Sequence, residues 1–218
     1  MTKFLPVVET FHSLQGEGFH CGKSAFFIRL AGCSVGCSWC DTKNSWDDKK
    51  HPLKSVEELS IETQKAVENG ASFLVITGGE PLHHNLNFFC KTIKHLNKSI
   101  AIHIETSGVD KLSGFYDWIT LSPKRHHPPQ TSLLRICDEI KVIINTEKDI
   151  EFAKKVKDTV STISSELPSY SKDKLNNKNY FIQPSWNNKL GYALAIEFAQ
   201  KNPDWCLSLQ THKYINLK

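Results

Sequence analysis

The stretch Gly32-Cys33-Ser34-Val35-Gly36-Cys37-Ser38-Trp39-Cys40 places three cysteines within eight residues, just after an apolar segment. Three thiolates folded around one centre can ligate three irons of a cubane iron–sulfur cluster, which leaves the fourth iron open for a ligand that is not protein. A closed structural zinc site needs a fourth protein ligand, and Cys21 and His51 are the nearest candidates. The spacing favours the iron–sulfur cluster over zinc, with unligated thiols as the remaining alternative.

The other cysteines are scattered, and the total of seven is odd. A secreted disulfide framework is denser and usually even, and the first residues hold no apolar run long enough for a signal peptide. All apolar runs are far shorter than the ~20 residues of a membrane span. We therefore expect a cytoplasmic protein with no membrane segment, in which the scattered cysteines are reduced thiols: Cys21, Cys90, Cys137 and Cys206.

Length and charge narrow the possible functions only a little. The chain has 218 residues, which fits one domain with a sizeable core, and its formal net charge is +4. A mild positive surplus suits anionic small molecules as readily as nucleic acid. Nucleic-acid modules interleave aromatic residues with clustered Lys and Arg, whereas the basic residues here are dispersed, so we expect no nucleic-acid partner.

Apolar, β-branched segments alternate with amphipathic segments along the chain. Ser55 and Glu58 form a capping-box pattern at the start of one helix, and Gly70 is placed to end it. The alternation indicates βαβ units and a mainly parallel sheet, with functional residues on the loops that leave the strand C-terminal ends. The predicted strands are 24–30, 72–77, 100–105, 118–121, 139–145, 180–183 and 206–209, and the predicted helices are 56–69, 86–96, 148–163 and 189–200.

Two stretches interrupt this alternation. Pro168–Lys178 is polar and rich in turn-forming residues, which predicts an exposed loop. The run His126-His127-Pro128-Pro129 cannot continue a helix or a central strand. Its two histidines, like the pair His83-His84, lie beside prolines, and adjacent histidines rarely share one metal, so we expect all four on the surface.

The cysteine spacing, the aromatic residue before Cys40 and the later segment Thr77-Gly78-Gly79-Glu80-Pro81 together resemble the signature of the radical S-adenosylmethionine superfamily. Within it, the chain is similar to the 7-carboxy-7-deazaguanine synthases from about Val7 to the C-terminus. The stretch Gln15-Gly16-Glu17-Gly18 narrows the resemblance to this family. The segments that carry it are Glu9–Gly18, Cys40–Thr42, Ser122–Lys124 and Gln210–Lys213.

The resemblance implies an α/β fold, namely a partial (incomplete) TIM-like barrel with mostly parallel strands. It implies a single domain over residues 1–218, with an N-terminal substrate-binding loop and a cluster loop at 9–42. The implied activity is that of a lyase, which contracts the ring of 6-carboxy-5,6,7,8-tetrahydropterin to 7-carboxy-7-deazaguanine with loss of ammonia, in queuosine and 7-deazapurine biosynthesis. The implied cofactors are one [4Fe–4S] cluster, S-adenosylmethionine and Mg²⁺. The implied partners are a flavodoxin- or ferredoxin-type electron donor and a second copy in a homodimer.

By the same resemblance, Cys33, Cys37 and Cys40 hold the cluster, and Trp39 lies near the adenine of S-adenosylmethionine. Core packing is the other interpretation of Trp39. In this family the hydroxyl of Thr42 holds Mg²⁺ together with the substrate carboxylate and water, and Mg²⁺ tolerates such a small number of protein ligands. From the residues alone Thr42 is a helix N-cap, so its metal role rests wholly on the resemblance.

Further cofactor contacts are expected on the loops after the strands. Gly78 and Gly79 let the backbone approach a ligand closely, and the Glu80 carboxylate can accept a hydrogen bond from the methionine ammonium. An ordinary turn is the other interpretation of this segment. No side chain is expected to act as an acid or base, because the cofactor radical does the chemistry. The remaining expected cofactor contacts are Ser107, Ser122, Lys124 and Gln183.

Gln15 and Glu17 are the expected substrate clamp, because their donor and acceptor groups can match the amide and amino-pyrimidine edge of a pterin. Without the resemblance, this glycine-rich stretch is a turn. Arg29 stands inside an apolar strand and needs a carboxylate partner, which is either the substrate or an internal salt bridge unless the side chain faces outward. The full expected substrate set is Leu14, Gln15, Gly16, Glu17, Arg29, Thr77 and His212.

Two other functions remain open at this point. A glycyl-radical-enzyme activating protein shares the three cysteines and the Gly-Gly-Glu-Pro segment, but nothing in that family accounts for Gln15, Arg29 and Thr42 together. A zinc-stabilised RNA-binding module is the non-enzyme alternative. Iron analysis of anaerobically purified protein separates the cluster from zinc.

Overall fold

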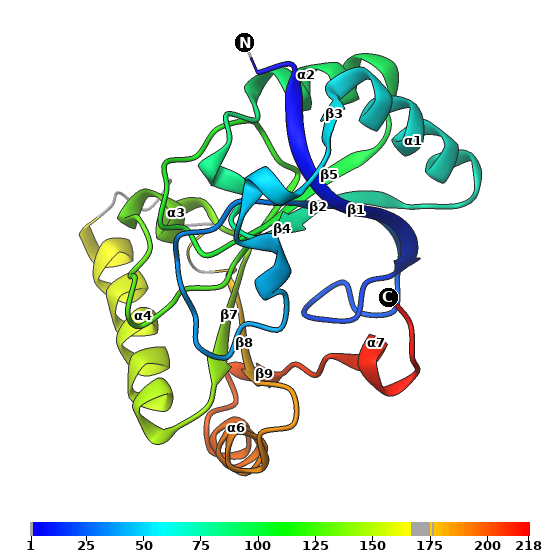
Figure 1. The fold of residues 1–218 in the computed structure, drawn as a ribbon. Coiled ribbons are helices and arrows are strands. Elements are labelled where there is room, and N and C mark those ends of the chain that lie inside the picture. Colours follow the sequence, from blue (N-terminus) through cyan, green and yellow to red (C-terminus); the bar gives the residue numbers. More distant parts are fainter. Residues whose placement is uncertain (1, 167–174, 176) are drawn as a thin grey trace.

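The computed structural model describes residues 2–166, 175 and 177–218, and over these it forms one open, curved sheet with helices on its outer side (Figure 1). The sheet has nine strands in the order β3-β1-β2-β4-β5-β6-β7-β8-β9. The strands are β1 (Phe4–Leu14), β2 (Ser24–Leu30), β3 (Leu53–Ser55), β4 (Phe73–Gly78), β5 (Ala101–Thr106), β6 (Trp118–Leu121), β7 (Glu139–Ile144), β8 (Asn179–Pro184) and β9 (Trp205–Leu207). The helices are α1 (Val56–Glu68), α2 (Asn87–Leu96), α3 (Thr131–Ile136), α4 (Glu147–Glu166), α6 (Lys189–Lys201) and α7 (Thr211–Tyr214).

All pairings from β2 to β9 are parallel, while β1 pairs antiparallel with both β2 and β3. The sheet ends at β3 on one side and β9 on the other, so the barrel is incomplete. The predicted fold class, an α/β partial barrel with mostly parallel strands, is confirmed. The capping box at Ser55 and Glu58 is also confirmed, with the Ser55 side chain accepting from the Glu58 backbone and the Glu58 side chain accepting from the Ser55 backbone.

The predicted elements differ from the observed ones mainly at the edges. The sequence analysis did not predict β1, β3, α3 or α7. It placed the last strand at 206–209, whereas β9 is Trp205–Leu207. The predicted loop Pro168–Lys178 lies largely outside the described residues; of its described members, Asn177 is exposed, whereas Leu175 and Lys178 are buried.

The two faces of the sheet have different chemistry because successive strand residues point to opposite sides. The outer face is apolar: Ile28 in β2, Ile76 in β4 and Ile104 in β5 are completely buried. Helices pack over this face, with α1 against β2, α3 against β6, α4 against β7 and α6 against β8. The inner face is mainly apolar near the strand starts, where Phe27 and Phe73 belong to one small apolar cluster. Towards the strand ends it becomes polar, and that is where a binding site can form.

The loop that joins β1 to β2 closes the lower end of the barrel, where the parallel strands begin. Phe19 stacks on Trp118 with ring centroids 5.1 Å apart, and His20 lies edge-on to the same ring at 4.5 Å. His103 stacks on Phe73 at 4.2 Å, and burial lowers the pKa of His103 to about 3. These rings form an uncharged floor beneath the polar part of the barrel. None of the described helices is both long and apolar enough to cross a membrane.

Candidate active site

A cavity of about 690 Å³ opens above this floor, at the C-terminal ends of the parallel strands. That volume lies within the usual range of small-molecule sites. The inner face contributes one polar side chain from each of six neighbouring strands to the cavity wall: Arg29, Thr77, Glu105, Thr120, Lys141 and Gln183. The cluster loop and the C-terminal segment after β9 complete the wall.

Cys33, Cys37 and Cys40 all line this cavity as free thiols. Burial raises the pKa of Cys33 and of Cys37, and each of these thiols also feels the charge of the other cysteines of the cluster loop. Gly36, with a φ of 70°, turns the backbone so that the loop can curl. The zinc candidates bond elsewhere: Cys21 Sγ lies 3.3 Å from Thr211 Oγ1, and His51 Nε2 lies 2.7 Å from the Asn44 carbonyl oxygen.

Gly78 packs against the backbone of Leu30 in β2, and Gly79 packs against the start of the cluster loop. A Cβ on Gly79 would lie 2.4 Å from the Gly32 carbonyl oxygen and 2.9 Å from Cys33 Cβ. The backbone bonds directly across this contact, with the Gly79 N–H donating to Leu30 at 2.9 Å and the Glu80 N–H donating to Gly32 at 2.8 Å. Both glycines line the cavity, and the backbone at Gly79 and Glu80 also joins the end of β4 to the end of β2 and the start of the cluster loop.

Glu80 is almost completely buried and lies behind the cavity wall. Its carboxylate accepts from Thr106 Oγ1 at 2.5 Å, from the Ser107 backbone N–H at 2.8 Å, from the Ser107 hydroxyl and from the Leu82 backbone. Ser107 itself lines the cavity. Glu80 therefore orients Ser107 in this structure.

Lys124 and Ser122 meet on the cavity wall at the end of β6. Lys124 Nζ donates to the Ser122 carbonyl oxygen at 2.7 Å and to Ser122 Oγ at 2.6 Å. Burial lowers the pKa of Lys124, and the neighbouring Cys37 thiol opposes that effect. A partly desolvated ammonium at this position is suited to an anionic group such as a carboxylate.

Gln15 reaches the inner face of the barrel from the loop after β1. Its Nε2 donates to Glu105 Oε1 at 2.9 Å, and the other oxygen of Glu105 accepts from Thr77 Oγ1 at 3.2 Å. Gln15 Oε1 accepts from the Glu17 backbone at 3.1 Å. The structure thus brings the predicted residues Gln15 and Thr77 together through Glu105, which the sequence analysis did not select as a site residue.

Glu17 forms a buried ion pair with Lys141, a residue of β7 that the sequence analysis missed. Gln210 Nε2 donates to the other Glu17 oxygen at 2.8 Å. Burial raises the pKa of Glu17, but the attraction of Lys141 and the hydrogen bonds from Lys141 and Gln210 outweigh it and hold that pKa at about 2. Glu17 is therefore ionised at neutral pH.

The C-terminal segment docks against the same loop. The Gly16 carbonyl oxygen accepts from the Thr211 backbone at 2.9 Å and from Thr211 Oγ1 at 3.0 Å. A Cβ on Gly16 would lie 2.0 Å from His212 Nδ1, so any larger residue at this position would have to displace the His212 side chain. His212 and Leu14, two of the expected substrate contacts, both line the cavity.

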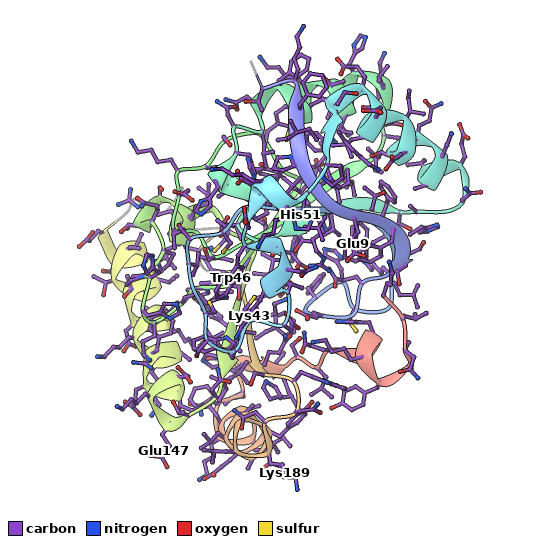
Figure 2. All side chains as sticks on the ribbon, in the orientation of Figure 1. Glu9, Lys43, Trp46, His51, Glu147 and Lys189 are labelled. Carbon is purple, nitrogen blue, oxygen red and sulfur yellow. The ribbon has the colours of Figure 1, made fainter. Side chains whose placement is uncertain are left out.

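Arg29 faces the cavity with an internal salt bridge, one of the alternatives left open by the sequence. Its Nε donates to Glu9 Oε1 at 3.1 Å, and Lys218 Nζ lies 3.0 Å from the other Glu9 oxygen (Figure 2 labels Glu9). Among the described residues, no hydrogen bond uses the terminal guanidinium nitrogens of Arg29. That end of the side chain is available to a ligand.

Thr42 and Trp39 line the cavity on the side of the cluster loop. Thr42 is the N-cap of a 3₁₀ turn (Lys43–Ser45), but its side chain makes no capping bond, and its hydroxyl lies 3.6 Å from Cys40 Sγ. Asp41 beside it forms an ion pair with Lys213. The following turn is braced by Lys43, whose Nζ lies 5.9 Å from the centre of the Trp46 ring; Figure 2 labels both residues.

The remaining predicted residue, Gln183, also lines the cavity, and its side-chain oxygen accepts from Ser208 Oγ at 2.7 Å. The expected surface positions of His83, His126 and His127 are confirmed, and His84 is half-buried. Within the described residues, no three His, Cys, Asp or Glu side chains are grouped as the ligands of a metal ion.

Comparison with known proteins assigns this arrangement to a family. A family model described as the Radical SAM superfamily matches residues 27–159. The 7-carboxy-7-deazaguanine synthase of Prochlorococcus marinus is 53% identical over 100% of both chains, and that of Synechocystis sp. is 42% identical over 100% of this chain and 96% of its own. The crystal structure of QueE from Escherichia coli superimposes with a TM-score of 0.75 at 31% identity, covering 96% of this chain and 95% of that one.

Proposed function

Because this chain belongs to the radical S-adenosylmethionine superfamily and, within it, to the 7-carboxy-7-deazaguanine synthases, we propose that its cavity converts 6-carboxy-5,6,7,8-tetrahydropterin to 7-carboxy-7-deazaguanine. The reaction contracts the pterin ring and releases ammonia, which makes the protein a lyase. The observation that carries the proposal is the meeting of two predicted residue sets in one cavity: the three cysteines on one side, and Gln15, Glu17 and Arg29 on the other.

The donor set suits a [4Fe–4S] cluster. A cubane takes one thiolate on each of three irons, so its ligands surround the cluster and need no fourth protein ligand. Cys33, Cys37 and Cys40 would be those ligands. A closed zinc site would need a fourth ligand, and both Cys21 and His51 are engaged elsewhere. The donor set therefore favours the cluster over zinc.

S-adenosylmethionine would lie beside the cluster, against Trp39, Gly78, Gly79, Ser107, Ser122, Lys124 and Gln183. When bound, the reduced cluster and S-adenosylmethionine supply the 5′-deoxyadenosyl radical that starts the reaction by removing a hydrogen atom from C6 of the pterin. Lys124 would pair with the carboxylate of the methionine moiety. Glu80 lies behind the wall, and we propose that it holds Ser107 and, through it, the methionine end of the cofactor.

The pterin would bind between the loop after β1 and the inner face of the sheet. Gln15 and Glu17 present an amide and a carboxylate to the amide and amino-pyrimidine edge of the substrate. The free end of Arg29 would hold the substrate carboxylate in a two-pronged contact. Leu14, Gly16, Thr77 and His212 complete the pocket. Glu105 and Lys141 keep Gln15 and Glu17 in position from below.

Mg²⁺ would be held by the Thr42 hydroxyl and the substrate carboxylate, with water completing its shell. The absence of a capping bond to Thr42 supports this role, because its hydroxyl is not committed to the backbone. An acidic one-electron donor of the flavodoxin or ferredoxin type and a homodimeric assembly complete the proposal. The net charge of +4 suits such a donor.

The decisive experiment incubates anaerobically reconstituted protein with 6-carboxytetrahydropterin, S-adenosylmethionine, Mg²⁺ and a reductant. Formation of 7-carboxy-7-deazaguanine is expected. Replacement of any of Cys33, Cys37 and Cys40 by alanine should abolish iron binding and activity, whereas Cys90→Ala, on the outer side of the sheet, should leave both intact. An iron-loaded protein that forms no deazaguanine product would refute the proposed substrate.

The magnesium role has a separate test. Thr42→Ala should lower turnover and flatten its dependence on Mg²⁺ concentration, because the metal loses its protein ligand. Thr42→Ser keeps the hydroxyl and should preserve most of the response. An unaltered Mg²⁺ dependence in Thr42→Ala would show that the hydroxyl does not hold the ion.

A further inference from the structure

Four polar side chains outside the cavity hold the cluster loop (Ala31–Cys40) from three successive loops of the barrel: three histidines contact its backbone, and Asp110 contacts one of these histidines. His83 and His84 follow the Gly78-Gly79-Glu80-Pro81 segment, Asp110 follows β5, and His126 follows β6. None of the four lines the cavity. Each of the three histidines contacts a different part of the cluster loop.

His84 holds the start of the loop. Its Nε2 lies 2.7 Å from the Ala31 carbonyl oxygen, and because a carbonyl only accepts, the hydrogen must be on Nε2. The ring also lies against Gly32, where an added Cβ would come within 3.3 Å of Nε2. The segment between the end of β2 and Cys33 is thus fastened to the loop that follows β4.

His83 holds the residue next to the first cysteine. The Ser34 backbone N–H donates to His83 Nε2 at 3.0 Å, and the Ser34 hydroxyl lies at the same distance. His83 Nδ1 is hydrogen-bonded to the Asp110 carboxylate. A carboxylate accepts the hydrogen of Nδ1, which leaves the lone pair of Nε2 facing Ser34. Asp110 therefore selects the tautomer that Ser34 requires.

His126 holds the middle of the loop. Its Nε2 donates to the Val35 carbonyl oxygen at 3.0 Å and lies 3.7 Å from Cys37 Sγ. The ring is also edge-on to Trp39, with centroids 5.5 Å apart. His127 beside it is exposed, and among the described residues its side chain makes no hydrogen bond.

We propose that His83, His84 and His126 are positioning residues that hold the cluster-loop backbone in the shape that presents its three thiols to the iron–sulfur cluster, with Asp110 fixing the tautomer of His83. The proposal rests on the proposed function, because it needs the cluster. These side chains bond Ala31, Ser34 and Val35, whereas the neighbouring Gly32 and Cys33 N–H groups bond to Ser45 and Trp46. The histidines thus bond the Ala31 and Val35 carbonyl oxygens and the Ser34 N–H, for which no backbone partner is found among the described residues.

The test measures iron retention by the full-length, anaerobically reconstituted protein. His84→Leu, His83→Leu and His126→Leu should each release iron to a ferrous chelator about fivefold faster than wild type, since one net hydrogen bond is worth about 1 kcal/mol. His84→Gln, which keeps an N–H donor, should restore most of the retention. Asp110→Asn should accelerate release as His83→Leu does, because it no longer imposes the tautomer.

The matched control is His127→Leu, which removes an adjacent exposed histidine and should leave the release rate unchanged. The low-temperature electron paramagnetic resonance spectrum of the reduced cluster is a second readout: it should broaden in the three leucine variants and not in the control. Equal release rates and spectra in wild type, variants and control would overturn the proposal while leaving the proposed function intact. A wild-type protein that takes up no iron would overturn both.

Discussion

Removal of Lys141 tests the most deeply buried ion pair of the site. In Lys141→Met, Glu17 keeps its burial but loses its cation, and the loss of one partner from a buried pair costs about 3–5 kcal/mol. The pKa of Glu17 gives a similar figure. Burial raises that pKa, whereas the attraction of Lys141 and three hydrogen bonds lower it; the net shift from 4.5 to about 2 amounts to about 3 kcal/mol at neutral pH.

The assay is a double-mutant cycle in urea on the reconstituted protein, with Lys141→Met, Glu17→Gln and the double variant. We expect a coupling free energy of about 3 kcal/mol at pH 7. The folded-state pKa of Glu17 lies below its unfolded value, so the stabilisation is complete above pH 4.5 and is lost as the pH falls towards 2. The coupling should therefore decrease by about 0.6 kcal/mol between pH 5 and pH 4. A coupling below about 1 kcal/mol at pH 7, or one that is larger at pH 4, would refute this reasoning.

Three further outcomes are expected. Gly79→Ala should lose its iron and about 2 kcal/mol of stability, because its Cβ would press on Gly32 and Cys33. The control variant Gly22→Ala, whose Cβ has no atom within 4 Å, should retain its iron. Equal iron contents in the two variants would contradict this expectation. Burial raises the pKa of Glu139 to about 7, so the contribution of Glu139 to stability falls as the pH rises through 7. Between pH 5 and pH 8, the unfolding free energy of Glu139→Gln, measured in urea, should therefore rise by about 2 kcal/mol relative to that of wild type. Parallel stability curves for the two proteins would contradict that expectation. Arg29→Lys keeps the charge but not the two-pronged contact, so the KM for the pterin should rise about tenfold or more while the affinity for S-adenosylmethionine stays similar. An unchanged KM would show that Arg29 only forms the salt bridge with Glu9.

The parallel part of the fold was predictable because its strands are buried on both faces. The segment around Ile76 is a continuous apolar run, and those around Ile104 and Ile140 are rich in isoleucine and valine between turn residues, which is typical of central parallel strands. Strand β1 was missed because it belongs to the antiparallel end of the sheet, where Pro6 and the polar residues Glu9, Thr10 and His12 obscure its period of two. The short β3 and α7 are set by tertiary contacts with β1 and with Gly16, which local sequence does not reveal.

The candidate site was predictable to the extent that its residues stand in motifs. The positions of the three cysteines and of Gln15 and Glu17 in one cavity agree with the expectation. Glu105 and Lys141 were missed although a signal was present: each is a charged residue inside an apolar strand, the same feature that singled out Arg29. The pairing of Arg29 with Glu9 was not predictable, because the register between β1 and β2 decides it.

The contact between Gly16 and Thr211 joins residues that are synthesised almost a full chain length apart. While the chain is still being made, strands β2 to β6 can already pair, but Glu17 has neither Lys141 nor Gln210 beside it. Long-range closures of this kind are slow and come late in folding. The pterin pocket is therefore among the last parts of the molecule to form. If the cysteines of a nascent chain bind iron before this contact forms, the cavity wall around them is still incomplete.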